Sequence, residues 1–239
     1  MPGYTRHQLK QDRFAETAAE TVSWAVEHRN KLIVGAVVVS IALVLSIGGY
    51  FYFDHRDSEA SVELGKAIRM YEAPLRPANA PAQPDFLTYT SASERATAAQ
   101  KEFKTVADKY PHTRSAEFAQ YFVGLTYRDM GDNKNAEQSL NDVAGAHNKD
   151  VAALARFALA GIYEETNREA DAIKSYQELI AHPTSTVPKA TAQLELAAIY
   201  QTKQPVEAAH IYDQIRKDDP RSPAAEIAGT KLSTLTGQK

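Results

Sequence analysis

The distribution of apolar and charged residues divides the chain into one uncharged run and a longer stretch in which both kinds alternate. The run has 22 residues without a charge, from Leu32 to Phe53, and reads LIVGAVVVSIALVLSIGGYFYF. As a helix it rises roughly 33 Å, enough to cross a hydrocarbon core about 30 Å thick.

The alternatives to a membrane-spanning helix are a buried core helix and a cleaved signal peptide, but the latter is usually shorter and followed by small residues. Here Tyr50, Phe51, Tyr52 and Phe53 follow, rings typical of a membrane interface. The pattern predicts one uncleaved transmembrane helix at 32–53.

The charges beside this run predict its orientation. Residues 1–31 carry five Lys/Arg against four Asp/Glu, a mild excess that favours a cytoplasmic tail, which we expect to be partly helical. The C-terminal part of this single-pass protein is then expected to face the periplasm or the cell exterior. Ala36 and Ser40 form a small-xxx-small pair of the kind that supports helix association, so a homo-oligomer is an open alternative.

Helical periodicity resumes directly after the run. Residues 54–73 carry apolar positions three and four apart, from Ala60 to Tyr71, and predict a helix that continues into a first repeat. Four prolines then fall between Pro74 and Pro84, and proline lacks the amide that a helix interior needs. Residues 74–92 are therefore predicted to be a Pro-rich insertion loop.

The rest of the chain repeats itself. Alanine is followed four residues later by a large apolar residue in four pairs: Ala99 and Phe103, Ala136 and Leu140, Ala172 and Tyr176, Ala208 and Tyr212. Successive large residues are 37, 36 and 36 apart, and a second series in register consists of Tyr127, Tyr163 and Tyr200. Two series with one period indicate a repeat architecture in which each unit buries its apolar face against its neighbours.

These residues resemble the tetratricopeptide repeat (TPR), whose first helix carries Leu-Gly-x2-Tyr and whose second carries Ala-x3-Phe before a proline. The matching dipeptides before the tyrosines are Val123-Gly124, Leu159-Ala160 and Leu196-Ala197, and the matching prolines are Pro111, Pro183 and Pro220. The period exceeds the usual one of about 34, tryptophan is absent from its position, and the second repeat ends without proline.

The resemblance implies an all-α fold, a TPR-like right-handed solenoid of antiparallel helix pairs preceded by one transmembrane helix. Repeats are expected over 93–221, with the helix at 58–73 supplying the first half of repeat one. Ser222 and Pro223 are start signals for a C-terminal capping helix and tail at 222–239.

Composition and motifs exclude several classes of function. The chain has no cysteine, hence no disulfide framework, cysteine-ligated metal or thiol nucleophile. A net charge of −3 with mixed signs lacks the basic footprint of a nucleic-acid binder. No HExxH, phosphate loop or GxSxG is present, so we expect neither enzymatic activity nor a cofactor or metal. His112, His147 and His182 recur near repeat ends at separations of 35 and are interpreted as exposed turn residues.

The candidate binding residues follow from the TPR resemblance, because first helices in that family usually line the concave face. The residues implied for protein binding are Phe118, Tyr121, Phe122, Leu125, Arg128, Leu154, Phe157, Glu164 and Leu194, with Gly161, Thr191, Ala198 and Gln201 on the same faces. They are mainly apolar and lack the basic clamp that grips a chaperone's C-terminal carboxylate. A groove of this kind suits an amphipathic helix or an extended segment. The alternative for Phe118, Tyr121 and Phe122 is packing of repeat against repeat.

An anchor followed by a TPR domain resembles the YfgM-like ancillary subunits of the Sec translocon. The segment from Lys109 to Ala116, KYPHTRSA, also resembles repeat joints of TPR proteins from outer-membrane assembly and the Tol-Pal system. The first resemblance implies a location in the bacterial inner (plasma) membrane, single-pass, with the C-terminal domain in the periplasm. It also implies protein partners near the translocon, such as translocon subunits or periplasmic chaperones. Two functions remain open: a module that recruits partners or exported clients at the membrane, and a structural organiser of envelope or division complexes through self-association.

Overall fold

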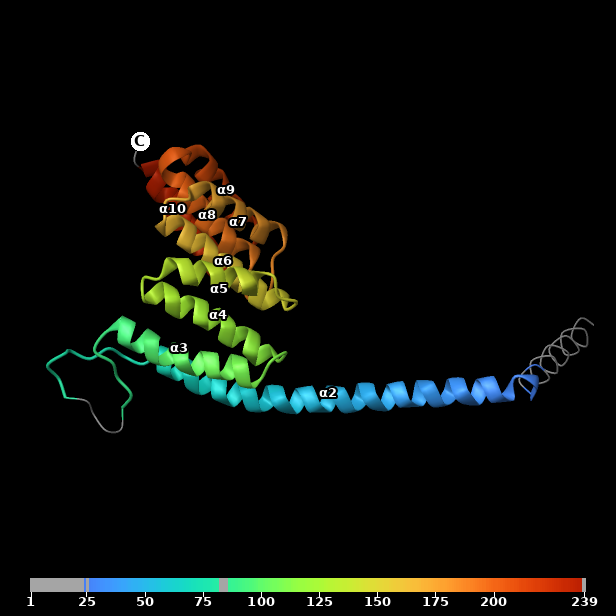
Figure 1. Cartoon of the computed structure of the whole chain (residues 1–239). Coiled ribbons are helices and arrows are strands. Elements are labelled where there is room, and N and C mark those ends of the chain that lie inside the picture. The colour runs from blue at the N-terminus through green and yellow to red at the C-terminus, as the bar shows by residue number, and fades with distance from the viewer. Residues whose placement is uncertain (1–23, 25, 82–85, 238–239) are drawn as a thin grey trace, which may run out of the picture. The chain divides into compact units, whose positions relative to one another are not determined.

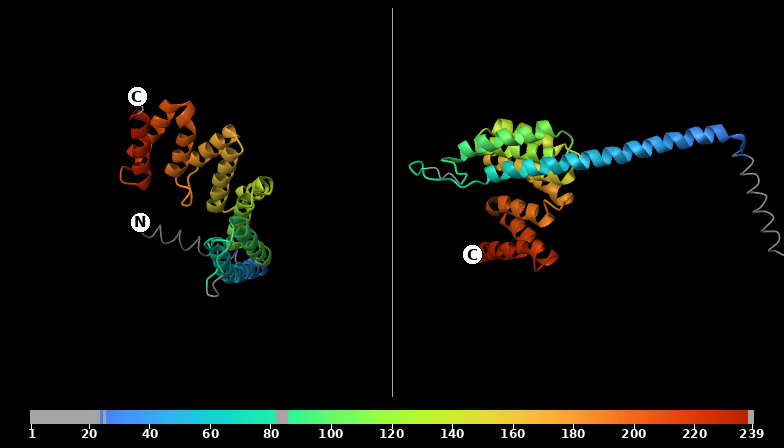
Figure 2. Two further views of the ribbon diagram at one scale, coloured as in Figure 1. Left: turned by 90° about the vertical axis from the view of Figure 1, so that its left-hand side faces the viewer. Right: turned by 90° about the horizontal axis from the view of Figure 1, so that it is seen from below.

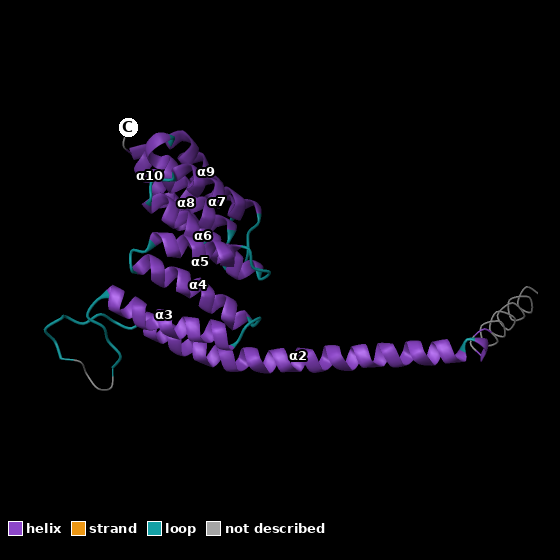
Figure 3. Ribbon diagram, in the orientation of Figure 1, coloured by secondary structure: helices purple, strands orange, loops and turns teal. Residues whose placement is uncertain are grey.

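The structure, a computed structural model, describes residues 24, 26–81 and 86–237. Across these residues the chain is helical, and extended backbone is limited to one isolated bridge between Leu75 and Tyr89 (Figure 3). The prediction of an all-α chain is thereby confirmed. The chain divides into two compact units, Met1–His55 and Arg56–Lys239, which are described separately below.

The first unit contains the apolar run. Its helix, α2 (Arg29–Tyr71), begins in this unit and ends in the second. An 18-residue window of α2 has a mean hydropathy of 2.6, and none of it is buried. By length and composition this helix would be able to cross a membrane. The transmembrane helix at 32–53 stays a prediction. Most of the predicted tail at 1–31 lies outside the described residues.

The second unit is a stack of helix pairs. After the last turns of α2 come α3 (Ala92–Lys109), α4 (Arg114–Asp129), α5 (Asn133–Ala144), α6 (Lys149–Glu165), α7 (Glu169–Ala181), α8 (Lys189–Lys203), α9 (Pro205–Asp218) and α10 (Pro223–Gly237). From α3 onward, consecutive helices pack in chain order (Figures 1 and 2). The pairs α4/α5, α6/α7 and α8/α9 have the arrangement of a TPR-like solenoid, as the repeat pattern predicts.

The periodic alanines and large residues make the core of this solenoid. Ala99, Ala136, Ala172 and Ala208 are fully buried, and so are the partners four residues later on the same helices. The small side chains let neighbouring helices approach, while the large ones fill the space between them. Residues 56–71 of α2 join this core, because Ala60, Leu64 and Ala67 pack with Phe103 of α3.

The turns inside the second and third repeats share one geometry. Gly131 has a φ of 77° and Asn167 a φ of 59°, the left-handed conformation that commonly ends a helix. The next residue in each turn donates its N–H back to a periodic tyrosine: Asp132 to the Tyr127 carbonyl at 2.9 Å, and Arg168 to that of Tyr163 at 2.7 Å. Glycine and asparagine are the residue types that tolerate this backbone best.

The predicted insertion loop is closed at its base. The Arg76 N–H donates to the Tyr89 carbonyl at 2.8 Å, and the Tyr89 N–H donates to the Pro74 carbonyl at 3.3 Å. Residues 82–85, including the last proline of the cluster, lie outside the described chain. Leu75 in this base, and Phe86 and Leu87 beyond it, are exposed.

Substituting Gly124 by alanine should destabilise the second repeat. A Cβ at this position would lie 2.6 Å from Cγ of Leu140, which is fully buried on α5 and has little room to move. Overpacking of this kind costs about 1–3 kcal/mol, of which the better helix propensity of alanine offsets at most about 1 kcal/mol. Urea unfolding of the full chain in detergent, followed by circular dichroism, measures the loss.

Gly161 is the matched control, since it also lies inside a first helix but an added Cβ would meet nothing within 4 Å. Gly161→Ala should raise the free energy of unfolding by up to about 1 kcal/mol through helix propensity alone. Equal effects of the two substitutions would contradict this account of close packing at Gly124.

Candidate functional site

The predicted binding residues of the second repeat lie along one face of α4, at helical spacing. Phe118, Tyr121 and Phe122 are half-buried, whereas Leu125 is only 9% exposed and packs into the core of the second and third repeats. The accessible part of this face is therefore aromatic, and Leu125 supports it from behind.

The aromatic residues of α4 also hold the first two repeats together. The Phe122 ring stacks on that of Phe103 at a centroid distance of 4.8 Å with 7° between the planes, and meets Tyr71 edge-on at 5.7 Å. Tyr121 meets Phe122 edge-on at 5.4 Å. Such pairs contribute beyond the area that they bury. Phe122 therefore packs between repeats, while a binding role for Phe118 and Tyr121 stays a prediction.

Tyr71 and Arg128 border this cluster on its polar side. The Tyr71 hydroxyl donates to the Asp129 carboxylate at 2.7 Å, and burial, followed by that hydrogen bond, raises the pKa of Tyr71 well above its ordinary value. The Arg128 guanidinium lies 3.9 Å from the same carboxylate. The periodic pattern placed Tyr71 on an apolar helix face, but gave no sign that it joins residues of α4.

The predicted residues of the third and fourth repeats form a second group. Leu154, Phe157 and Leu194 are half-buried against the core of these repeats, and Phe157 meets the Tyr176 ring edge-on at 5.6 Å. Glu164 is exposed and accepts a hydrogen bond from the Tyr176 hydroxyl at 2.7 Å.

A further carboxyl, which the sequence reasoning missed, lies near this group. Burial raises the pKa of the Glu195 carboxyl on α8 above its ordinary value, the Glu164 carboxylate raises it further, and Lys231 opposes both.

The other predicted positions on the first helices differ in exposure. Ala198 is exposed, Thr191 is half-buried, and Gln201 donates to the Tyr212 hydroxyl at 2.6 Å.

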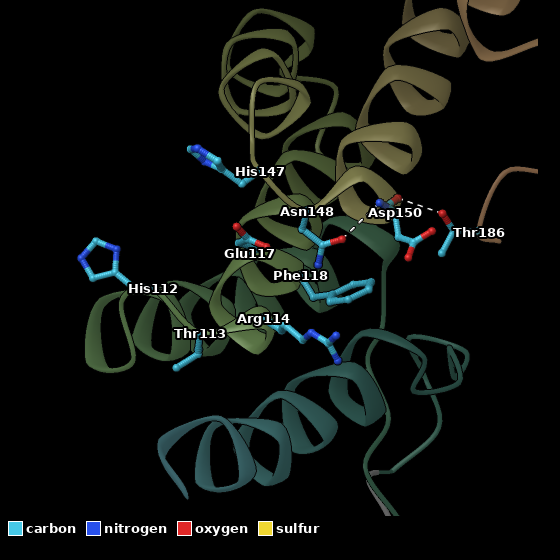
Figure 4. Close-up of a pocket in the computed structure, with 9 residues that line it drawn as sticks. All are labelled: His112, Thr113, Arg114, Glu117, Phe118, His147, Asn148, Asp150 and Thr186. Atoms are coloured by element: carbon cyan, nitrogen blue, oxygen red, sulfur yellow. Dashed lines mark hydrogen bonds between the residues drawn. The ribbon is translucent and has the colours of Figure 1, made fainter. Parts of the chain in front are cut away.

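A hollow of about 520 Å³ opens beside Phe118, where the turns between repeats meet (Figure 4). Its lining comes from the start of α4, the turn before α6 and the segment before α8: His112, Thr113, Arg114, Glu117, Phe118, His147, Asn148, Asp150 and Thr186. Phe118 is the single predicted binding residue in this lining. His112 and His147 are exposed, as expected of turn residues, but the fold brings both to one hollow.

Side-chain caps shape this hollow. The amide of Ser115 donates to Asp57 at 2.9 Å and that of Ala116 to Thr113 at 3.1 Å, so the second and third amides of α4 already have acceptors. Asn148 accepts from the amides of Asp150 and Val151 in the same way at α6. The hollow therefore offers an aromatic ring and charged side chains, rather than a cradle of unused amides.

The chemistry of these surfaces fits recognition of a polypeptide. Arg114, Glu117 and Asp150 supply both signs of charge around the Phe118 ring, and aromatic residues with arginine are typical anchors of protein interfaces. Among the described residues, no group of three or more His, Asp or Glu side chains is placed to hold a metal ion.

Comparisons with known proteins agree with this architecture. Residues 22–185 match the family described as "Tetratricopeptide repeat-like domain". A tetratricopeptide repeat protein from Parabacteroides merdae is 20% identical with a TM-score of 0.47; the match covers 61% of this chain and 55% of that one. Two structures of nearly identical TPR-like repeats from Podosopora anserina are 16% and 17% identical, each with a TM-score of 0.54 and coverage of 77% of this chain and 89% of theirs. The likeness to the two Podosopora anserina structures is one of fold.

No curated protein sequence matches the chain. The family match alone spans well over half of it, from the residues before the apolar run to the turn after α7. The chain therefore belongs to the tetratricopeptide repeat-like domain family.

Proposed function

We propose that this protein is a membrane-anchored TPR module that recruits partner proteins or exported clients at the bacterial inner membrane. Domains of this type are generally non-catalytic scaffolds that bind protein partners. We place its solenoid in the periplasm and its partners near the Sec translocon, with translocon subunits and periplasmic chaperones as the first candidates.

The observation that carries the proposal is the aromatic surface of α4. Phe118 and Tyr121 are half-buried on a first helix, and Phe118 borders a hollow that has room for side chains of a bound segment. Because Phe122 stacks on Phe103 and meets Tyr121 edge-on, the Tyr121 ring is held in place before a partner arrives, which lowers the entropic cost of binding.

The anchor rests on the apolar part of α2. The unburied window of mean hydropathy 2.6, the rings at 50–53 and the mild basic excess before residue 32 all favour a single span with the N-terminal side in the cytoplasm. The place near the translocon rests on the resemblance to the YfgM-like subunits, and identifying the partner tests it.

Photo-crosslinking from the hollow tests the proposal. A benzophenone amino acid in place of Phe118, in the full chain in inner-membrane vesicles, should give discrete crosslinked polypeptides, because a bound segment would lie within reach of the probe. Mass spectrometry then identifies them.

The control probe replaces Val206, which is 83% exposed on α9, and should give no such products. The same products from both positions, or none from position 118, would contradict a binding role for this surface. Crosslinks from position 118 to a second copy of the chain would instead support the self-associating organiser.

A further inference from the structure

A second hollow, of about 550 Å³, lies beside α6 where α5 ends and α7 ends. Its apolar lining includes Ala152 and Ala153 of α6, Ala181 at the end of α7, and Pro183 just after it. The cationic side chains of Lys149 and Arg156 also line it. Neither Phe118 nor any other predicted binding residue contributes.

Helical spacing places this hollow next to the face of α6 that carries Phe157. Lys149, Ala152, Ala153 and Arg156 follow one another at intervals of three, one and three residues and share one stripe of α6. Phe157 lies four residues after Ala153, so this stripe adjoins the one that carries Leu154, Phe157 and Glu164.

Small side chains explain why the space is open. Ala152 and Ala153 are buried against neighbouring helices and add little surface, whereas Ala181 and Pro183 are exposed and form the apolar floor of the hollow. This floor hydrogen-bonds poorly, so water there is replaced favourably by apolar groups of a ligand.

The charges around the floor have one sign. No carboxylate lines this hollow among the described residues. Lys149 is exposed and forms no ion pair within the described chain. Arg156 donates to the Ala144 carbonyl at 2.8 Å and also borders a neighbouring hollow with Asp171 and Glu178, so Lys149 is the cation with the least compensation.

We infer that this hollow binds an acidic, apolar segment of a partner protein. A leucine-sized side chain of that segment lies on the apolar floor of Ala181 and Pro183, and an Asp or Glu carboxylate beside it pairs with Lys149. Partly desolvated pairs of this kind contribute more than fully exposed ones, and they select the sign of the ligand.

Three heptapeptides with a biotinylated N-terminus and an amidated C-terminus test the inference. They have the sequences Ser-Asp-Leu-Leu-Asp-Ser-Gly, the same with Asn for Asp, and the same with Lys for Asp, each immobilised through biotin. The full chain in zwitterionic lipid nanodiscs is passed over them in biolayer interferometry. We expect the acidic peptide to bind at least tenfold more tightly than the neutral one, the basic peptide not to bind, and affinity to fall with salt.

The substitution Lys149→Glu should lower the affinity for the acidic peptide at least tenfold. The folding of α6 should be kept, since an acidic residue in the first turn suits the helix dipole. Lys101→Glu makes the same charge change at an exposed position on α3 and should leave affinity unchanged, as should Phe118→Ala. Equal binding of acidic and neutral peptides, or unchanged binding by Lys149→Glu, would overturn the inference while leaving the crosslinking test from position 118 untouched.

Discussion

Three arginines in the middle of the apolar run are expected to remove the protein from the membrane. The run contains 13 Leu, Ile, Val and Phe residues, each of which favours insertion by about 0.3–0.6 kcal/mol. An arginine near the centre of a span costs about 2.5–3.5 kcal/mol. The triple variant Val38→Arg, Ile41→Arg and Val44→Arg thus loses more free energy of insertion than the apolar residues supply. The measurement is the fraction of protein that stays with the membrane after alkaline carbonate extraction.

A matched control carries three arginines outside the run. Leu75, Val206 and Ile227 are exposed apolar residues of the second unit, and Leu75→Arg, Val206→Arg and Ile227→Arg together change the net charge by the same amount. This variant should stay in the membrane fraction. Retention of the first variant to the same extent would show that residues 32–53 do not anchor the chain.

Phe103→Ala is expected to lower the free energy of unfolding of the first repeat by about 3–5 kcal/mol. Phe103 is fully buried, stacks on Phe122, and packs with Ala60 and Ala67 of α2. Its removal leaves a cavity that these short side chains cannot fill. Because stability in a solenoid is a sum over neighbouring repeats, the loss should be local: amide hydrogen exchange should rise in α3 and residues 56–71 before it rises in α8 and α9.

Phe86→Ala is the control, with the same chemical change at a side chain that is 67% exposed. It should alter the free energy of unfolding by no more than about 0.5 kcal/mol. If Phe103→Ala has an equally small effect, the stack on α4 is not what joins the first two repeats. Loss of crosslinking from position 118 in the Phe103→Ala protein would indicate that this stack also supports the candidate binding face.

The repeat class could be predicted because its evidence is periodic. Ala136 and Leu140 at one helical turn's spacing, repeated at Ala172 and Tyr176, indicate which helix faces are buried whatever their neighbours are. The candidate face was harder to predict. Phe118, Tyr121 and Phe122 have the same spacing and chemistry in the sequence, and only their packing distinguishes Phe122, which stacks on Phe103, from Phe118, which reaches a hollow.

The sequence by itself determined the helical periodicity, the breaker loop after Ala73 and the single apolar run, because these depend on local spacing and on the backbone limits of proline and glycine. Tertiary structure alone decided that Asp57 caps α4, that Tyr71 bonds to Asp129 across 58 positions, and that His112 and His147 share one hollow. Such contacts join residues far apart in the chain, so their geometry depends on how the helices stack, which no local pattern specifies.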